Sequence, residues 1–217
     1  SVMGALVYLV KTRLPEYIGA SPFEIQVLTP MRKGELGVEH LNEVLQYYLN
    51  PASESKKEKE GRTGVFREGD KVMQVKNNYK LEWKITNAKG FSIEEGLGVF
   101  NGDMGIIKQI NTYSERITVV FDENREAEYP FSSLDELELA YAITIHKSQG
   151  SEYPAVVLPL LSGPPILCNR NLLYTAITRA QKCVAIAGRQ SMVEQMIHNE
   201  TEQKRYSGLN DCLKEGL

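Results

Sequence analysis

A polar segment between two apolar runs carries most of the side chains that could do chemistry. The apolar runs are 140–145 and 155–160, and the polar segment between them, residues 146–152, reads HKSQGSE. Two buried strands that bracket a polar segment with a glycine are typical of an α/β domain that binds ligands at a sheet edge. Thr144, His146 and Lys147 can all donate to phosphate oxygens without reading base identity. No serine or cysteine nucleophile pattern neighbours His146, which argues against a hydrolase triad.

Three further cationic side chains could bind phosphate. Arg179 follows an apolar helical stripe in LLYTAITRA and lies off that stripe. Its planar, permanently charged guanidinium suits phosphate oxygens, although a surface arginine at the negative end of the helix dipole is the alternative. Arg32 and Lys33 follow the short apolar run 25–29, at the strand end where open α/β sheets bind ligands. A solvated turn is the alternative for this pair.

Four motifs resemble, in the same order, those of superfamily 1 helicases. They are VLTPMRKGELGVEHLNEVLQ, VFNGDMGII, TIHKSQGSEYPAVVLP and NLLYTAITRAQKCVAIAG. The closer resemblance is to the RecD-like group, which includes the exodeoxyribonuclease V alpha subunit. One such motif would be weak, whereas four in order over most of the chain make a specific signal.

The resemblance implies a role for each polar residue. It makes Arg179 the arginine finger for the γ-phosphate of ATP, and it sets Arg32 or Lys33 against the phosphates without deciding between them. A structural histidine remains the alternative for His146, and an exposed loop carboxylate remains the alternative for Glu152. The resemblance places Gln149, Gly150 and Glu152 at the nucleotide. It places Thr144, His146 and Lys147 at the backbone of single-stranded DNA.

The sequence also lacks parts that an ATPase needs. It contains no GxxxxGK[ST] phosphate loop and no acidic strand of the type that holds magnesium. Since phosphoryl transfer requires both, the chain is expected to be a C-terminal piece of a larger helicase, folded but inactive as an ATPase alone. ATP and Mg²⁺ would belong to the full-length parent, with no metal ligand in this piece.

The resemblance further implies a parent that moves 5′ to 3′ along single-stranded DNA and serves DNA repair and recombination. Expected partners are single-stranded DNA, the N-terminal RecA-like domain of the same parent chain and possible subunits of a helicase–nuclease complex. The sequence shows no carboxylate cluster typical of a nuclease. Two other functions stay open: a non-catalytic module that binds DNA or docks a protein, and an ordinary nucleotide-binding α/β enzyme.

The first 65 residues read as α/β. Apolar positions at helical spacing predict a helix over residues 1 to about 15 that ends at Pro15, and a strand follows at 25–29. A helix with one apolar face covers 38–49. The charged stretch 52–62, ASESKKEKEGR, predicts a mobile surface loop.

Residues 66–134 read as several short strands with tight turns, which indicates a small barrel. The resemblance makes it an SH3-like barrel inserted in a RecA-like parallel-sheet domain formed by 1–65 and 135–217, so the fold class is α/β with a β insertion. Asn101–Asp103 reads as a turn. Trp83 and Tyr79 could stack on bases, but a small barrel usually needs its aromatic residues for its own core.

The α/β pattern resumes after residue 134. Apolar positions from Leu172 predict a helix with one buried stripe, and a strand follows at 183–187. Ser191 is expected to cap a last helix, and the polar tail from Asn199 is expected to fray.

Composition is that of an ordinary globular protein. Hydrophobic residues make up 42% and charged residues 24% of 217 residues, and the net charge is −3. This charge argues against a dominant basic surface, although a local groove needs only a few cations to bind nucleic acid. No apolar run is long enough to span a membrane, and the start reads as an amphipathic helix, not as a signal peptide. Three widely spaced cysteines suit a reducing cytoplasm.

Overall fold

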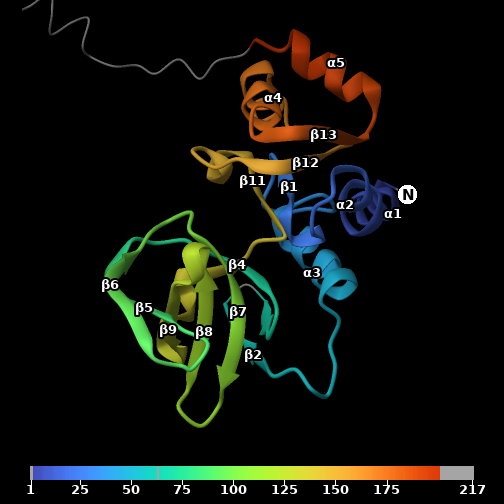
Figure 1. The fold of residues 1–217 in the computed structure, drawn as a ribbon. Helices are drawn as coiled ribbons and strands as arrows, with labels where there is room; N and C mark the ends of the chain where they lie inside the picture. The colour runs from blue at the N-terminus through green and yellow to red at the C-terminus, as the bar shows by residue number, and fades with distance from the viewer. Residues whose placement is uncertain (1, 63, 201–217) are drawn as a thin grey trace, which may run out of the picture.

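A parallel sheet forms one half of the molecule in the computed structural model, which describes residues 2–62 and 64–200 (Figure 1). Its strand order is β11-β1-β12-β13, and all neighbours are parallel. The strands are β1 (Ile25–Thr29), β11 (Ala142–Thr144), β12 (Tyr153–Leu160) and β13 (Ala180–Gly188). The predicted RecA-like α/β class is confirmed.

Helices cover both faces of this sheet. Alternate residues of a strand point to opposite faces, so neighbouring residues of β12 join different apolar clusters. Ala155 and Val157 pack in one cluster with Leu6, whereas Val156 and Leu158 pack in another with helix residues near the C-terminus. The helices are α1 (Val2–Tyr8), α2 (Leu14–Ile18), α3 (Val38–Leu49), α4 (Arg170–Ile177) and α5 (Gln190–His198). None of them is long and apolar enough to cross a membrane.

Two predicted helix boundaries are wrong. Pro15 does not end the first helix, because a π-helical turn over Leu9–Arg13 leads into α2 and places Pro15 in its first turn, where a missing N–H is tolerated. The helix ends instead at Gly19, whose φ of 68° is the left-handed cap conformation. Ser191 lies inside α5, and Arg189 precedes that helix without a side-chain capping bond.

The second half is an antiparallel sheet of seven strands that curls into a small barrel (Figure 1). Its order is β10-β4-β7-β8-β9-β5-β6. The strands are β4 (Lys71–Gln74), β5 (Asn78–Thr86), β6 (Ser92–Val99), β7 (Met104–Asn111), β8 (Arg116–Phe121), β9 (Glu126–Pro130) and β10 (Leu137–Leu139). The inserted β-barrel is thus confirmed, while the exact division at 65 and 134 stays a prediction.

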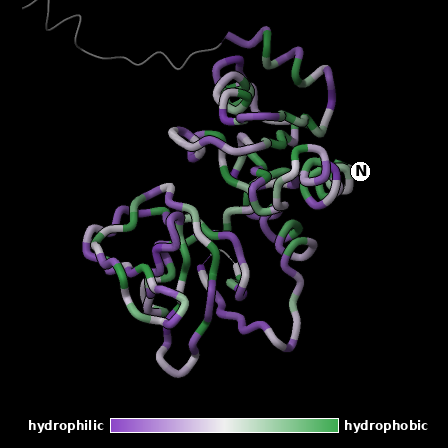
Figure 2. Tube along the Cα trace, in the orientation of Figure 1, coloured by the Kyte–Doolittle hydropathy of each residue, from purple (hydrophilic) through white to green (hydrophobic). Residues whose placement is uncertain are grey.

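Part of the charged stretch 52–62 is a strand, so the prediction of a loop is wrong there. β2 (Glu58–Glu60) pairs antiparallel with β3 (Val65–Arg67), and Arg67 Nε donates to Glu58 Oε1 at 2.6 Å. The stretch is strongly hydrophilic in Figure 2, so the backbone ladder and this ion pair hold the strand pair, with little apolar burial in β2. The predicted tail lies mostly beyond residue 200, outside the described residues.

A buried carboxylate links the two halves. Asp70, fully buried just before β4, accepts hydrogen bonds from the side chains of Gln46 (2.6 Å), Asn50 (2.7 Å) and Tyr141 (2.9 Å) and from the backbone of Arg67 (2.6 Å). Burial raises the pKa of the Asp70 carboxyl, and these hydrogen bonds partly oppose that rise. The network joins α3, the barrel and the entry to β11.

Candidate functional site

Basic residues gather after the carboxyl ends of two neighbouring strands. Thr29 at the end of β1 lies beside Thr144 at the end of β11. Arg32 and Lys33 follow β1, and a 3₁₀ turn, Ile145–Ser148, follows β11. The sequence-predicted phosphate and DNA-backbone residues therefore start from adjacent positions of the sheet, at the edge where α/β proteins bind ligands.

A carboxylate that the sequence reasoning missed joins two of these cations. Glu138 Oε1 accepts from Arg32 Nη2 at 3.1 Å, and Oε2 accepts from Lys147 Nζ at 2.8 Å. Burial alone would raise the pKa of the Glu138 carboxyl, but the hydrogen bonds from Lys147 and Arg32 outweigh it and hold the pKa below its ordinary value. Lys33, in contrast, is exposed and forms no ion pair with a described residue.

Thr144 shapes the 3₁₀ turn. Its side chain accepts from the backbone N–H of Lys147 at 3.4 Å, as an N-cap does. His146 is exposed on the same turn. Half-buried Thr144 and exposed His146 thus lie within one turn of each other, while Lys147 turns back to Glu138.

Arg179 lies at the junction between α4 and β13, where the chain turns back into the sheet. Asn169 caps α4 by accepting from the N–H of Leu172 at 2.9 Å, and this cap fixes the start of the helix. The guanidinium donates to Thr175 O at 3.3 Å, Ser151 O at 3.2 Å and Thr178 Oγ1 at 3.4 Å. All three acceptors are uncharged.

The second part of the polar segment lies next to Arg179. The hydrogen bond from the Arg179 guanidinium to Ser151 O brings Arg179 next to the residue that precedes Glu152. Glu152 is exposed and accepts from Gln181 Nε2 at 3.3 Å. Gln149 and Gly150 are exposed too, and Gly150 has a φ of 88°, which a residue with a side chain rarely adopts.

The structure divides the predicted nucleotide-binding set into two groups. Arg32 and Lys33 follow the carboxyl end of β1, whereas Glu152 and Arg179 precede the amino ends of β12 and β13. Since the strands are parallel and a strand rises about 3.3 Å per residue, the two ends of the sheet are roughly 20 Å apart. Gln149 and Gly150 lie on the connection between them, and the nucleotide roles of all these residues stay predictions.

The described residues contain no cluster of three or more His, Cys, Asp or Glu side chains that could hold a metal ion. Trp83 packs within the barrel: a Cβ on Gly96 would come within 2.3 Å of its ring. Arg125 lies 5.7 Å from the ring centroid. Tyr79 is exposed and meets Phe100 edge-on at 5.5 Å. Tyr79 is the more exposed of the two aromatic residues, and base stacking by either stays a prediction.

Two family models match the chain. One describes the ATP-dependent RecD-like DNA helicase SH3 domain and matches residues 41–121. The other describes the UvrD-like helicase C-terminal domain and matches residues 139–187. The first begins in α3 and covers most barrel strands, and the second covers β11, β12, α4 and most of β13.

Curated relatives agree with these matches. The ATP-dependent RecD2 DNA helicase of Deinococcus radiodurans is 39% identical over 167 residues, which cover 77% of this chain and 20% of that protein. The RecBCD enzyme subunit RecD of Mycolicibacterium smegmatis is 30% identical over 191 residues, which cover 88% of this chain and 29% of that protein. The chain therefore spans less than a third of the length of either relative.

Among solved structures, a Pif1 helicase from Bacteroides in complex with ADP-AlF3 and ssDNA is similar to 88% of this chain and 44% of its own, at 18% identity and a TM-score of 0.47. That likeness is too distant to bear on the site. The family matches, the two curated relatives and the parallel sheet with its inserted barrel agree. The chain belongs to the RecD-like superfamily 1 helicases and corresponds to part of their C-terminal motor region.

Proposed function

We propose that this chain supplies the arginine finger and DNA-backbone contacts of a parent helicase that hydrolyses ATP and moves 5′ to 3′ on single-stranded DNA. The observation that carries the proposal is the set of hydrogen-bond partners of Arg179. Its guanidinium bonds only to uncharged oxygens, and no carboxylate of the described residues forms an ion pair with it. Such a charge is available to a transferring phosphate, whose oxygens gain negative charge in the transition state.

In this proposal Gln149, Gly150 and Glu152 face the nucleotide beside Arg179. Glu152 accepts from ribose hydroxyls, and Gly150 permits close backbone approach. Arg32 and Lys33 follow the opposite end of the parallel strands, so their proposed phosphate contact is a separate part of the proposal. Exposed Lys33 is the more available of the two because Glu138 binds Arg32. Mg²⁺ would be held by the rest of the parent, since these described residues offer no ligand cluster.

The DNA contacts would come from Thr144, His146 and Lys147, which can donate to phosphates irrespective of sequence. We further propose the N-terminal RecA-like domain of the parent as the partner that completes the ATP site, and a cytoplasmic place of action. One relative is named as a subunit, the RecBCD enzyme subunit RecD. By analogy, we propose that the parent of this chain assembles with helicase–nuclease subunits.

The isolated chain is inactive as an ATPase in this proposal, since its sequence contains no phosphate loop. Isothermal titration of the chain with ATP and Mg²⁺ should detect no tight binding, and no phosphate should be released on addition of single-stranded DNA. Tight binding or turnover by the chain alone would contradict the proposal.

The deciding experiment compares ATP hydrolysis by the parent chain with wild-type sequence and with Arg179→Ala, with and without single-stranded DNA. Loss of an arginine finger should lower the DNA-stimulated rate by roughly 10³-fold while DNA binding is kept. Arg170→Ala is the matched control, because Arg170 begins α4, the helix that precedes Arg179, but pairs with Glu200 at 2.7 Å. Its rate should match the wild type.

A non-catalytic DNA-binding or docking module is the second candidate. It is favoured by one observation: Glu138 already binds two of the predicted phosphate-binding cations, Arg32 and Lys147. An Arg179→Ala parent that keeps the wild-type ATPase rate would favour this module over the motor.

A further inference from the structure

A lysine of the barrel reaches into the amino end of the parallel sheet. Lys71, the first residue of β4, is only 7% exposed. Its ammonium donates to Phe23 O at 2.7 Å and to Gln26 Oε1 at 2.9 Å. Phe23 precedes β1 and Gln26 lies within it, so this one side chain ties the barrel to the start of the central strand.

The same ammonium lies near the first residue of β12, the strand that forms a hydrogen bond with Arg179. Lys71 Nζ lies 6.0 Å from the ring centroid of Tyr153, the first residue of β12. The backbone N–H of Tyr153 donates to Arg179 O at 2.8 Å, and Arg179 Nη1 donates to Ser151 O at 3.2 Å. Residues on both sides of Glu152 therefore hold Arg179, and one of them rests on the barrel lysine.

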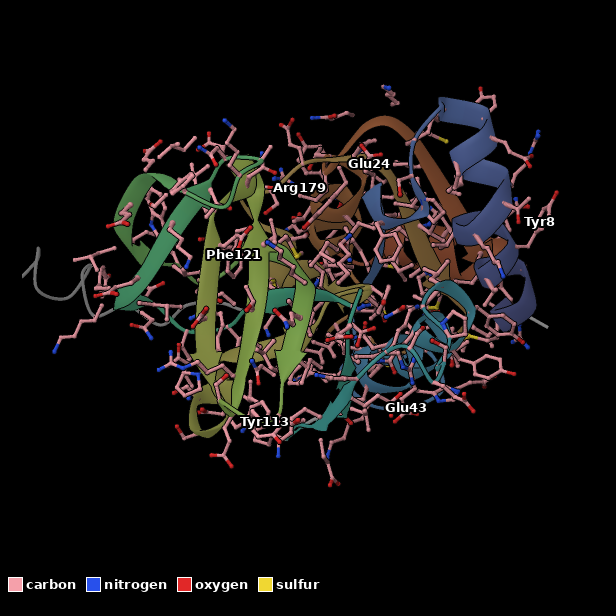
Figure 3. The ribbon with its side chains drawn as sticks, turned by 60° about the horizontal axis from the view of Figure 1, so that its bottom comes forward. Tyr8, Glu24, Glu43, Tyr113, Phe121 and Arg179 are labelled. Atoms are coloured by element: carbon pink, nitrogen blue, oxygen red, sulfur yellow. The ribbon has the colours of Figure 1, made fainter. Side chains whose placement is uncertain are left out.

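An open cleft of about 650 Å³ lies beside this contact. Its lining includes Lys71 and Phe121 of the barrel and Tyr153 and Glu24 of the α/β half. In Figure 3 Arg179 and Glu24 lie between the barrel and the rest of the α/β half, Phe121 lies on the barrel, and Tyr113 lies at the far end of the barrel. A shift of the barrel at this junction would move Lys71 relative to Tyr153.

We propose that Lys71 is a positioning residue for Arg179, so that the seating of the barrel on the parallel sheet controls ATP hydrolysis. This inference rests on the proposed role of Arg179 as arginine finger. The barrel sets Lys71, Lys71 holds the ring of Tyr153, and Tyr153 with Ser151 fixes the loop against which the guanidinium lies. A displacement of about 1 Å at a catalytic group can lower a rate by up to roughly 10²-fold, so a modest movement is sufficient.

The charge of Lys71 gives the link a dependence on pH. Burial lowers the pKa of the ammonium to about 8, and the charge of Glu24 partly opposes that effect. A neutral amine loses the attraction to the ring face of Tyr153. The other titratable groups that line the same cleft are Asp103, Asp122 and Glu152.

The test measures DNA-stimulated ATP hydrolysis by the parent chain. Lys71→Met, which keeps most of the length of the side chain but removes the ammonium, should lower kcat about 10-fold while the KM for ATP and the affinity for single-stranded DNA change less than about 2-fold. Tyr153→Leu should lower kcat to the same extent, and the double variant should be no slower than either single one, because both act through one contact. Lys108→Met is the control, since that barrel lysine is exposed and pairs with Glu126.

A pH series supplies a second readout, whose first part uses the wild type alone. The wild-type kcat should fall as pH rises through about 8, and Lys71→Met should lack that fall. If Arg179→Ala collapses the rate but Lys71→Met and Tyr153→Leu keep the wild-type kcat, the positioning role is overturned and the arginine finger stands. If Arg179→Ala leaves the rate unchanged, the proposed function fails and the positioning role fails with it.

Discussion

At the scale of single residues, the cationic side chains of the candidate site differ in whether a carboxylate already pairs with them. Arg32 and Lys147 share Glu138, whereas Arg179 bonds only to neutral oxygens. A cation with a buried carboxylate partner must give up that partner before it binds phosphate. The free energy lost with the ion pair offsets much of the free energy gained by binding phosphate. Exposure and motif position alone do not separate these two kinds of cation.

Glu138 gives a prediction for stability. Its folded-state pKa is held below the ordinary value of 4.5, so its ion pairs contribute fully above that pH and are lost as pH falls through the folded-state pKa. Glu138→Gln should lower the free energy of unfolding at pH 7 by about 1 kcal/mol and should flatten its decline below pH 4.5. Urea unfolding between pH 3 and about pH 7 measures both.

Glu128→Gln is the matched control for this experiment. Glu128 pairs with Arg116 at 3.5 Å, and its side chain is 46% exposed. An exposed pair of this kind contributes little, so its removal should shift stability by less than about 0.5 kcal/mol. Equal effects of the two substitutions would show that Glu138 is only a surface charge.

The sequence predicted the positions of Arg179 and Lys147 but not of Glu138. The polar segment and the helix stripe are local patterns, and each can be read from a short window. Glu138 lies in the run ELELAYAIT, where a charge on a strand ordinarily faces water. Its contact with Arg32 joins residues 106 positions apart, and no local pattern carries that information.

At the scale of elements, apolar strands were predictable and polar strands were not. β1, β11 and β12 are covered on both faces, and strands of this kind read as continuous apolar runs. The β5–β6 hairpin has a mostly exposed pattern, so its sequence reads as a polar stretch around Trp83. β2 was missed for the same reason, since two of its three residues are exposed.

Asp70 gives a prediction for the joint between α3, β4 and β11. Asp70→Ala leaves the donors of Gln46, Asn50 and Tyr141 without their acceptor in a buried place, so it should cost roughly 3 kcal/mol or more of unfolding free energy. Thermal and urea unfolding of the isolated chain measure the loss.

The control for this variant is Asp135→Ala. Asp135 pairs with one charged partner, Lys76, but lies at the surface, where its removal should change stability little. A loss at Asp70 no larger than the loss at Asp135 would mean that the network is replaceable by water and does not join the two halves.

At the scale of the whole molecule, the fold class followed from the order of patterns: α/β, then short strands, then α/β again. The sequence could not predict how tightly the halves are joined. One apolar cluster includes Leu6 and Val157 of the α/β half and also Val72 and Phe121 of the barrel. Because the two halves share this core, the barrel and the α/β half stabilise each other, and the barrel is not merely attached by its two connections.

The shared core predicts that the isolated chain unfolds in one transition. Trp83, the only tryptophan, lies in barrel strand β5, so its fluorescence reports the barrel alone. The α-helices of the described residues lie outside the barrel, so the far-ultraviolet circular dichroism signal of helix reports the other half. Coincident midpoints for the two signals are the mark of a single cooperative transition.

Asp70→Ala should lower both midpoints by the same amount, because the network belongs to the joint and not to either half. Two separate midpoints in the wild type would show that the barrel folds independently of the sheet. A barrel with that freedom could not hold Lys71 against Tyr153 with the rigidity that positioning of Arg179 requires. Cooperative unfolding is therefore the physical condition on which barrel control of the arginine depends.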